Sequence, residues 1–311
     1  MIDVTGLKPW GGLAGAPDGA PVTLAGIPYD GSAVYRKGAA QAPQRVRQLS
    51  AVMPPVTEEG HLLTGLGVHD MGDLTAGSDI ESGWTHVADR LAEVPADSVL
   101  TVLGGDHCTA IATLAAQARR HPQLKVLWVD AHPDLCDFSR GGRWTCGCAL
   151  RRALDVSGIA PDRVVIVGGR DYDPEELDFI RDKGVTLVGA RELASSPEAA
   201  LKRVRDSLAG AEVHVSFDID VLDPAFAPGT EIPSSGGLTT RQALEVLHAA
   251  ASVSRFVGLD LVELSPPFDS GNITTLAALK VIFEFWGLAQ NRPSVLQEQS
   301  NHDQPEAARE Q

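Results

Sequence analysis

Seven short runs of apolar residues divide the chain, and polar or amphipathic stretches separate them. The runs are nearly continuous, as in parallel strands that helices cover on both faces. They fall at residues 21–28, 98–103, 125–129, 163–167, 185–188, 213–217 and 255–261. The alternation of strand and helix patterns predicts an α/β fold with a mostly parallel central sheet.

Capping residues indicate where several of the intervening helices begin and end. An N-cap residue followed by proline opens two of them, a Thr-x-x-Gln capping box opens a third, and glycine follows the last turn of the first two. The expected helices run from Asp173 to Gly184, from Ser196 to near Gly210, from Thr239 onward, and from a cap at Asn272 through the apolar stretch 273–288.

The composition is that of a globular protein with an acidic surface. Hydrophobic residues make up 43% of the 311 positions, which is enough for a large core. We expect one domain over residues 1–289 and a disordered polar tail over residues 290–311. The net charge of −15 and the absence of a basic cluster argue against a nucleic-acid partner and favour a small cationic ligand.

Targeting signals and cysteine usage suggest where the protein works. The N-terminus lacks the basic and apolar regions of a signal peptide. We also find no apolar run near the roughly 20 residues that span a bilayer, so no membrane association is expected. The four cysteines gather within residues 108–148 instead of spreading as a disulfide framework would, which predicts a reducing, cytoplasmic location.

Carboxylates and histidines gather at the ends of three expected strands. Asp130, His132 and Asp134 follow one apolar run, Asp218 and Asp220 follow another, and His107 follows a third. Alternate residues of a strand point to one side, so each set should converge. Burying so much negative charge is costly unless cations lie among it. The pattern predicts two divalent metal ions and hydrolysis by metal-activated water.

A simpler interpretation applies to any one of these residues taken alone. A single aspartate at a strand end is usually a cap or turn residue, and Asp106, Asp137 and Asp223 could be such residues or could orient the metal ligands. A single strand histidine is usually structural. Three such clusters at three strand ends favour metal binding.

Several motifs together resemble those of the ureohydrolase family, which includes arginases, agmatinases, guanidinobutyrases and formimidoylglutamases. The three longest are Gly104-Gly-Asp-His107, Asp130-Ala-His-Pro-Asp134 and the segment from Ser216 to Gly229. Shorter matches lie at Pro28–Gly31 with Gly38, at Gly236–Thr239 and at Val262–Pro266. The resemblance covers roughly residues 20–288.

The resemblance implies a three-layer α/β/α fold, assembly as a homotrimer or homohexamer, and a dinuclear centre with two divalent ions, most often Mn²⁺. It would place one ion between His107, Asp130, Asp134 and Asp218, and the other between Asp130, His132, Asp218 and Asp220. Asp130 and Asp218 would bridge the ions and take part in catalysis. Glu263 matches the glutamate that faces the substrate guanidinium, where a carboxylate can accept paired hydrogen bonds. If Glu263 is not that residue, it would be a surface glutamate.

Four departures from the family pattern bear on the activity. Cys146 occupies the place of a histidine that is thought to shuttle protons, so a thiol, water or another group would have to deliver them. Cys108 replaces a common serine, and Glu231 replaces a common glycine, either as an extra carboxylate at the site or on its rim. The segment Leu135–Phe138 lacks the arginase loop for the amino-acid end of arginine, and the longer loop to Arg152 most resembles thermophilic and archaeal agmatinases.

These features predict an agmatinase-like hydrolase of a small cationic guanidino substrate, either agmatine or a derivative, yielding urea and an amine. Catalytic roles would fall to Glu263, Asp130, Asp218 and Cys146. Guanidinobutyrate, arginine or a formimino compound remain alternatives, and an anionic substrate end would need Arg140, Arg143 or Arg170. A non-catalytic metal-binding relative, and more remotely a deacetylase, also remain open. Cys136, Cys146 and Cys148 could form a soft metal site or redox switch, or be ordinary loop residues.

Overall fold

One sheet of eight strands organises the computed structural model, which describes residues 6–17, 19–75 and 80–290. Every strand pairs in parallel with its neighbours, in the order β2-β1-β3-β8-β7-β4-β5-β6. The strands are β1 (Val22–Ile27), β2 (Val68–Asp73), β3 (Val99–Gly104), β4 (Lys125–Val129), β5 (Val164–Val167), β6 (Thr186–Val188), β7 (Glu212–Asp218) and β8 (Arg255–Val262).

All seven predicted strands are confirmed, and β2 is an additional strand that its sequence did not indicate. Its residues, Val-His-Asp-Met-Gly-Asp, are mostly polar because β2 is an edge strand and only Val68 is fully buried. Arg47 stabilises this edge by donating to Asp70 at 2.8 Å and to Asp73 at 2.5 Å. An edge strand of this kind depends on its partners more than on its own apolar pattern.

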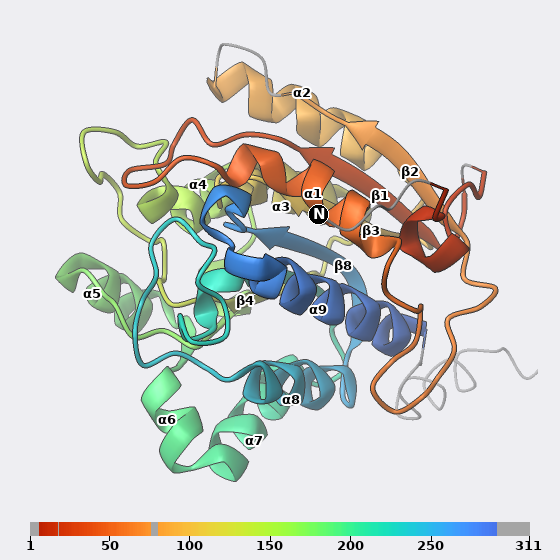
Figure 1. The fold of residues 1–311 in the computed structure, drawn as a ribbon. Coiled ribbons are helices and arrows are strands. Elements are labelled where there is room, and N and C mark those ends of the chain that lie inside the picture. The colour runs from red at the N-terminus through yellow and green to blue at the C-terminus, as the bar shows by residue number, and fades with distance from the viewer. Residues whose placement is uncertain (1–5, 18, 76–79, 291–311) are drawn as a thin grey trace, which may run out of the picture.

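Helices cover both faces of the sheet, which confirms the three-layer arrangement (Figure 1). Buried side chains of α1, α6, α7, α8 and α9 join one core cluster, and those of α2, α3, α4 and α5 join the other. The helices are α1 (Ala42–Ser50), α2 (Ile80–Ala92), α3 (Thr109–Arg120), α4 (Ala149–Ser157), α5 (Pro174–Lys183), α6 (Ala190–Ser195), α7 (Pro197–Leu208), α8 (Thr240–Ala251) and α9 (Ile273–Gln290).

The predicted helix caps at Asp173 and Thr239 are confirmed, whereas Ser196 precedes α7 without a side-chain capping bond. Asp173 and Thr239 each form a capping box, and Gly184 ends α5 in the left-handed conformation. Asn272 stands directly before α9 but does not cap it, because its backbone is left-handed, with a φ of 62°, and its side-chain oxygen accepts from Arg45. Instead, Asp269 accepts the backbone N–H groups of Thr274 and Thr275, each at 2.8 Å.

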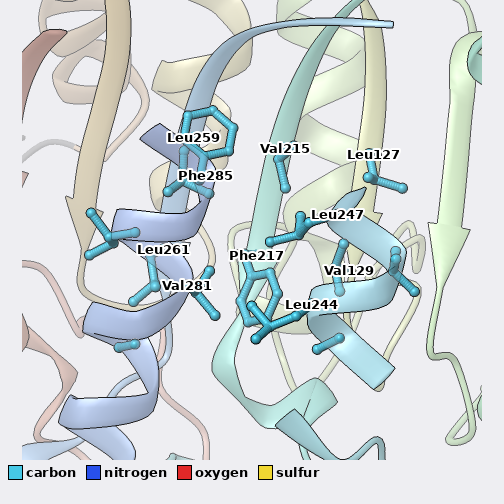
Figure 2. Packing of buried hydrophobic residues seen from close by; sticks show 14 of the residues in the cluster. Leu127, Val129, Val215, Phe217, Leu244, Leu247, Leu259, Leu261, Val281 and Phe285 are labelled. Atoms are coloured by element: carbon cyan, nitrogen blue, oxygen red, sulfur yellow. The ribbon is translucent and has the colours of Figure 1, made fainter. Parts of the chain in front are cut away.

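The long helix α9 belongs to the core. By length and composition alone, residues 270–290 could span a membrane, contrary to the sequence expectation, but 61% of the most apolar window is buried inside the protein. Val281 and Phe285 of α9 lie over Leu259 and Leu261 of β8, beside the contacts that α8 makes with β4 and β7 (Figure 2). A core helix satisfies the same length and hydropathy criteria as a membrane span. The predicted disordered tail lies, from residue 291 on, outside the described residues.

The order of the strands determines which loops meet. Strands β3, β8, β7 and β4 are consecutive in the middle of the sheet. Because all strands are parallel, the loops that follow these four strands emerge side by side at one edge of the sheet. Ligands of open α/β sheets bind at this edge.

Candidate metal centre and active site

Three of the predicted residues lie close together at the ends of β3, β4 and β7. His107 lies in the loop after β3, Asp130 directly follows β4, and Asp218 is the last residue of β7. The Nδ1 atom of His107 lies 3.0 Å from Oδ2 of Asp130 and 3.1 Å from Oδ2 of Asp218. Oδ2 of Asp134 lies 3.4 Å from the same nitrogen.

A second group shares Asp130 with the first. The Nδ1 atom of His132 lies 3.5 Å from Oδ1 of Asp130 and 3.1 Å from Oδ2 of Asp220. Asp130 therefore directs one oxygen towards each histidine. Within each of the groups His107–Asp130–Asp218 and Asp130–His132–Asp220, the potential ligand atoms lie within 4.8 Å of one another. The structure thus brings together all six residues that the sequence indicated.

The reason for this convergence differs from the predicted one. Strand β4 ends at Val129, so Asp130, His132 and Asp134 belong to a bent loop in which Asp134 has a φ of 54°. Strand β7 ends at Asp218, and Asp220 lies in a short 3₁₀ turn. The expectation that alternating strand positions align these residues is wrong, because loop geometry aligns them instead.

The donors fit a pair of divalent cations. Nδ1 of His107 and Oδ2 of Asp130 are buried and have no hydrogen-bond partner among the described residues, although they face each other. Burial and the neighbouring aspartates raise the pKa of Asp134 and Asp218 well above the ordinary value. Burial alone would lower the pKa of His107, but the adjacent carboxylates outweigh it and raise the pKa to about 9. Oxygen-rich sites with some imidazole suit ions such as Mn²⁺.

A network of buried hydrogen bonds holds the imidazole ring of His107 in place. Ser216 donates to Oδ1 of Asp260 at 2.5 Å, so its oxygen is free to accept from Nε2 of His107 at 2.9 Å. In the neutral ring, that bond places the imidazole hydrogen on Nε2 and directs the Nδ1 lone pair at Asp130. The ring also stacks on Trp128 at a centroid separation of 3.9 Å. Such outer hydrogen bonds orient metal-binding histidines.

The network continues through His214, and every member is fully buried. Gln117 donates from Nε2 to Nδ1 of His214 at 3.1 Å, so His214 carries its hydrogen on Nε2 and donates to Oδ2 of Asp260 at 2.7 Å. Thr113 donates to that oxygen as well, at 2.7 Å. These bonds outweigh burial and hold the pKa of Asp260 below its ordinary value.

The sequence analysis missed this network, although two signals were present. Asp260 interrupts the apolar run of β8, where an unpartnered carboxylate would be very costly. His214, Ser216 and Asp218 occupy alternate positions of β7, so one face of a buried strand is polar. In the sheet, Ser216 is paired in register with Asp260 on β8.

Glu263 is buried beside the metal-ligand candidates and is not a surface residue, being 4% exposed. It directly follows β8 in the left-handed conformation, with a φ of 63°. Its N–H donates to the carbonyl of Gly105, and its Oε1 accepts the N–H of His107, each at 2.8 Å. Its Oε2 is buried with no partner among the described residues. Burial, followed by the charges of Asp218 and Glu231, raises its pKa well above the ordinary value.

A cavity of about 320 Å³ opens over these residues. Its lining includes His132, Asp218, Asp220 and Glu263, together with residues of the loop after β4 and of the segment before α5. The other lining residues are Val34, Asp134, Cys136, Ser139, Arg140, Cys146, Gly147, Asp171, Tyr172, Asp173, Glu176, Glu231 and Ile232. The size suits a small extended molecule.

The cysteines near the cavity do not form one cluster. Burial and the charges of Glu263 and Glu231 raise the pKa of Cys146, so its thiol stays neutral in the cavity. Cys136 lies with Asp173 and Glu176, and Cys148 contacts neighbouring loop atoms. All four cysteines are reduced. The described residues do not bring Cys136, Cys146 and Cys148 together as one set of metal ligands.

The remaining predicted residues divide between the cavity and structural roles. Arg140 lines the cavity, whereas Arg143 pairs with Asp137, and Arg170 donates to backbone carbonyl groups. Asp106 and Asp223 accept backbone N–H groups of nearby turns, as the simpler interpretation of single aspartates expects. The loop residues Leu135–Phe138 include only Cys136 in the described cavity wall.

Comparison with known proteins identifies related sequences. The model of the Arginase family matches residues 20–287. Proclavaminate amidinohydrolase from Streptomyces clavuligerus is 34% identical over 279 residues, which are 85% of this chain and 87% of that protein. Its structure superimposes with a TM-score of 0.81 at 33% identity, over 88% of this chain and 93% of that one.

Two further relatives have names that indicate different substrates. The guanidinopropionase of Pseudomonas aeruginosa is 34% identical over 276 residues, which are 86% of each chain. The agmatinase of Bacillus cereus is 32% identical over 273 residues, which are 85% of this chain and 90% of that protein.

Proposed function

The chain belongs to the arginase family and is a hydrolase of guanidino C–N bonds, and from that premise we propose that its substrate is a linear guanidino compound with a cationic far end. Agmatine and agmatine derivatives are the simplest such compounds. The products are urea and an amine.

The charge of the cavity carries this proposal. If the four aspartates nearest the histidines are neutralised by two divalent ions, five lining carboxylates remain: Asp171, Asp173, Glu176, Glu231 and Glu263. Arg140 is the one Arg or Lys side chain among the described lining residues. A cavity with this excess of negative charge attracts a molecule with two positive charges and repels one that ends in a carboxylate.

The residues assigned to the two ions are those with convergent donors. His107, Asp130, Asp134 and Asp218 are the proposed ligands of one ion, which we take to be Mn²⁺. Asp130, His132, Asp218 and Asp220 are those of the other. Bound there, the two ions would activate water for attack on the guanidino carbon and stabilise developing negative charge.

The protein's own groups would bind and orient the substrate. The unpartnered Oε2 of Glu263 accepts N–H groups of the guanidinium, and its Oε1 stays fixed by the N–H of His107. This arrangement holds one edge of the planar guanidinium against the buried carboxylate of Glu263. Cys146 is the catalytic candidate in the place of the family histidine, but its neutral thiol is a weaker proton carrier than imidazole, so water in the open cavity would deliver the proton to the leaving amine.

A guanidino acid is the second candidate substrate, and one observation favours it. Arg140 lies at the cavity wall, where it could pair with a carboxylate at the far end of the substrate. The guanidinopropionase relative is named for such a compound. The two candidates predict opposite effects of removing the charge of Arg140.

Three compounds of matched length test the proposal. Urea release by the Mn²⁺-loaded protein is measured with agmatine, butylguanidine and 4-guanidinobutyrate, using wild type and Arg140→Gln. We expect the highest kcat/KM with agmatine, and little change for agmatine in the variant. Fastest turnover of 4-guanidinobutyrate, lost in Arg140→Gln, would establish the guanidino acid instead. No urea from any compound, with two ions bound, would indicate a different substrate or a non-catalytic protein.

The reduced cysteines and the resemblance support two further proposals. We expect a cytoplasmic enzyme that assembles as a homotrimer or homohexamer. Light scattering of the purified protein, compared with the 32.9 kDa mass of one chain, tests the assembly. A monomer in solution would overturn it.

A further inference from the structure

Glu231 is a buried carboxylate in the cavity wall to which the family pattern assigns no function. Its side chain is almost completely buried, with 2% exposed. Its Oε2 has no hydrogen-bond partner among the described residues, yet the residue lines the cavity. An ionised carboxylate without a partner is costly in such a place. A residue of this kind therefore needs a cation or a hydrogen-bond donor from the ligand.

The other carboxylate oxygen of Glu231, Oε1, is held in place by hydrogen bonds. Oε1 accepts the backbone N–H groups of Val34 and Tyr35 at 2.5 and 2.8 Å. Arg36 fixes the backbone as well, because its side chain donates to the carbonyl groups of Thr230 and Glu231 at 2.6 and 3.0 Å. One oxygen is thus anchored to the segment before α1, and the direction of the other is set before any ligand binds.

Glu231 lines the same cavity as Glu263, Asp218 and Asp220. Its charge helps to raise the pKa of both Glu263 and Cys146, and its own pKa is raised first by burial and then by Asp220, among others. These neighbours belong to the metal-ligand candidates and to the glutamate that faces the substrate head.

We propose that Glu231 is a second guanidinium-binding carboxylate, whose Oε2 accepts N–H groups of the substrate head beside Glu263. The proposal rests on the proposed guanidino substrate. A monosubstituted guanidinium has five N–H donors in one plane, and a single carboxylate oxygen satisfies only part of them. If two carboxylates contact different edges of the guanidinium, the site selects a substrate that has free N–H groups at both edges. Methyl groups on the terminal nitrogens would therefore exclude a compound from the site.

The variant Glu231→Gln isolates the proposed contact. Glutamine keeps an oxygen for the N–H groups of Val34 and Tyr35 and replaces Oε2 by an NH₂ group, which faces the substrate with donors. We expect kcat/KM to fall by about 10- to 100-fold for agmatine and butylguanidine alike. Glu245→Gln, an exposed change on α8, serves as the matched control with wild-type kinetics. Metal content and thermal midpoint are measured for both variants.

Three results would overturn the proposal. Unchanged kinetics in Glu231→Gln would show that Oε2 does not contact the substrate. A loss confined to agmatine, with butylguanidine unaffected, would place Glu231 at the amine end. A loss of kinetics accompanied by a loss of bound metal or a lower thermal midpoint would assign it a structural role.

Urea release by the wild-type protein distinguishes a failure of the proposed function from a failure of the proposed Glu231 contact. If the wild-type protein releases no urea from any compound, calorimetric titration of the metal-loaded protein with agmatine replaces kinetics. Weaker binding by Glu231→Gln than by wild type and Glu245→Gln would still support the carboxylate contact. Equal affinities in all three proteins would reject it.

Discussion

The substitution Asp260→Asn tests whether the buried network sets the hydrogen position on His107. In the native protein, Asp260 accepts from Thr113, His214 and Ser216 at 2.5–2.7 Å. Asparagine replaces one acceptor oxygen by an NH₂ group. If that group faces Ser216, the hydroxyl must accept from it and donate to Nε2 of His107. The imidazole hydrogen then moves to Nδ1, the atom that should bind a metal ion.

The opposite orientation of the asparagine is also unfavourable. An NH₂ group facing His214 would force that ring to accept on Nε2 and to carry its hydrogen on Nδ1. Nδ1 faces the amide nitrogen of Gln117, whose orientation is fixed because its oxygen accepts from Arg120 at 2.5 Å. Two donors would then meet in the core. Either orientation leaves a mismatch, worth about 1–3 kcal/mol for a buried polar group.

The expected result is weaker binding of one metal ion by about 10- to 100-fold, the size usual for loss of an outer hydrogen bond at a metal site. This range agrees with the mismatch energy, since 1.4 kcal/mol corresponds to a factor of ten. The group of His132 and Asp220 has no contact with Asp260 among the described hydrogen bonds, so its affinity should stay near wild type.

Metal-free protein is titrated with Mn²⁺, and bound ions per chain are counted at each free-ion concentration. Thr113→Val is the matched control, because it removes a donor to the same carboxylate but leaves the Ser216 bond intact. It should lose about 1 kcal/mol of stability and keep both affinities. If Asp260→Asn binds both ions as tightly as wild type, the network does not determine the hydrogen position on His107.

Four further changes have defined outcomes. Glu263→Gln should lower kcat/KM for urea release by about 10- to 100-fold, with unchanged metal content, because it removes the acceptor facing the guanidinium; wild-type kinetics would contradict that role. Cys146→Ala should keep kcat within about threefold, since a thiol with a raised pKa gives up its proton poorly, and a larger loss would restore it as a proton donor. The raised pKa of His107, about 9, means that the ion-free ring must lose a proton to bind metal. The affinity for Mn²⁺ should therefore rise as the pH increases from about 6.5 to 9. The loss of this one proton accounts for at most about a tenfold rise per pH unit, and an affinity that does not change with pH would contradict the prediction. Gly105→Ala should prevent normal folding, because its Cβ would overlap the Tyr29 carbonyl, and an unchanged thermal midpoint would refute that clash.

Much of the fold follows from local patterns in the sequence. Central strands such as β4 and β7 must be apolar because helices cover both faces, and caps such as Asp173 and Thr239 act within a few residues. Strand β2 was missed because an edge strand needs little burial. Asn272 was mistaken for a cap because the true cap, Asp269, reaches α9 across a short 3₁₀ segment, which no local pattern specifies.

The residues of the site were easier to predict than their geometry. The carboxylates and histidines after three apolar runs indicated His107 and Asp134, but the alternation of strand positions was the wrong reason for Asp134 to lie beside Asp130 and His132. Asp134 reaches the site because its own backbone is left-handed. Glu263 reaches it because β8 lies between β3 and β7. The order of strands depends on which helices pack on which face, and the sequence does not state it.

The comparison of Asp260 with Asp106 suggests which aspartates carry information about function. Asp106 follows a strand, and its oxygens accept backbone N–H groups of two turns, from Cys108 two residues on and from Ser32 in a neighbouring loop. Asp260 lies inside a strand with apolar neighbours on both sides, where local structure offers it no donor. Such a carboxylate is tolerable only if side chains from neighbouring elements supply donors, as those of Ser216 and His214 do. Those donors have to be held in fixed positions, and through Ser216 the network fixes His107 as well. A charge in the interior of a buried strand therefore indicates a constructed polar site more specifically than a charge at the strand end.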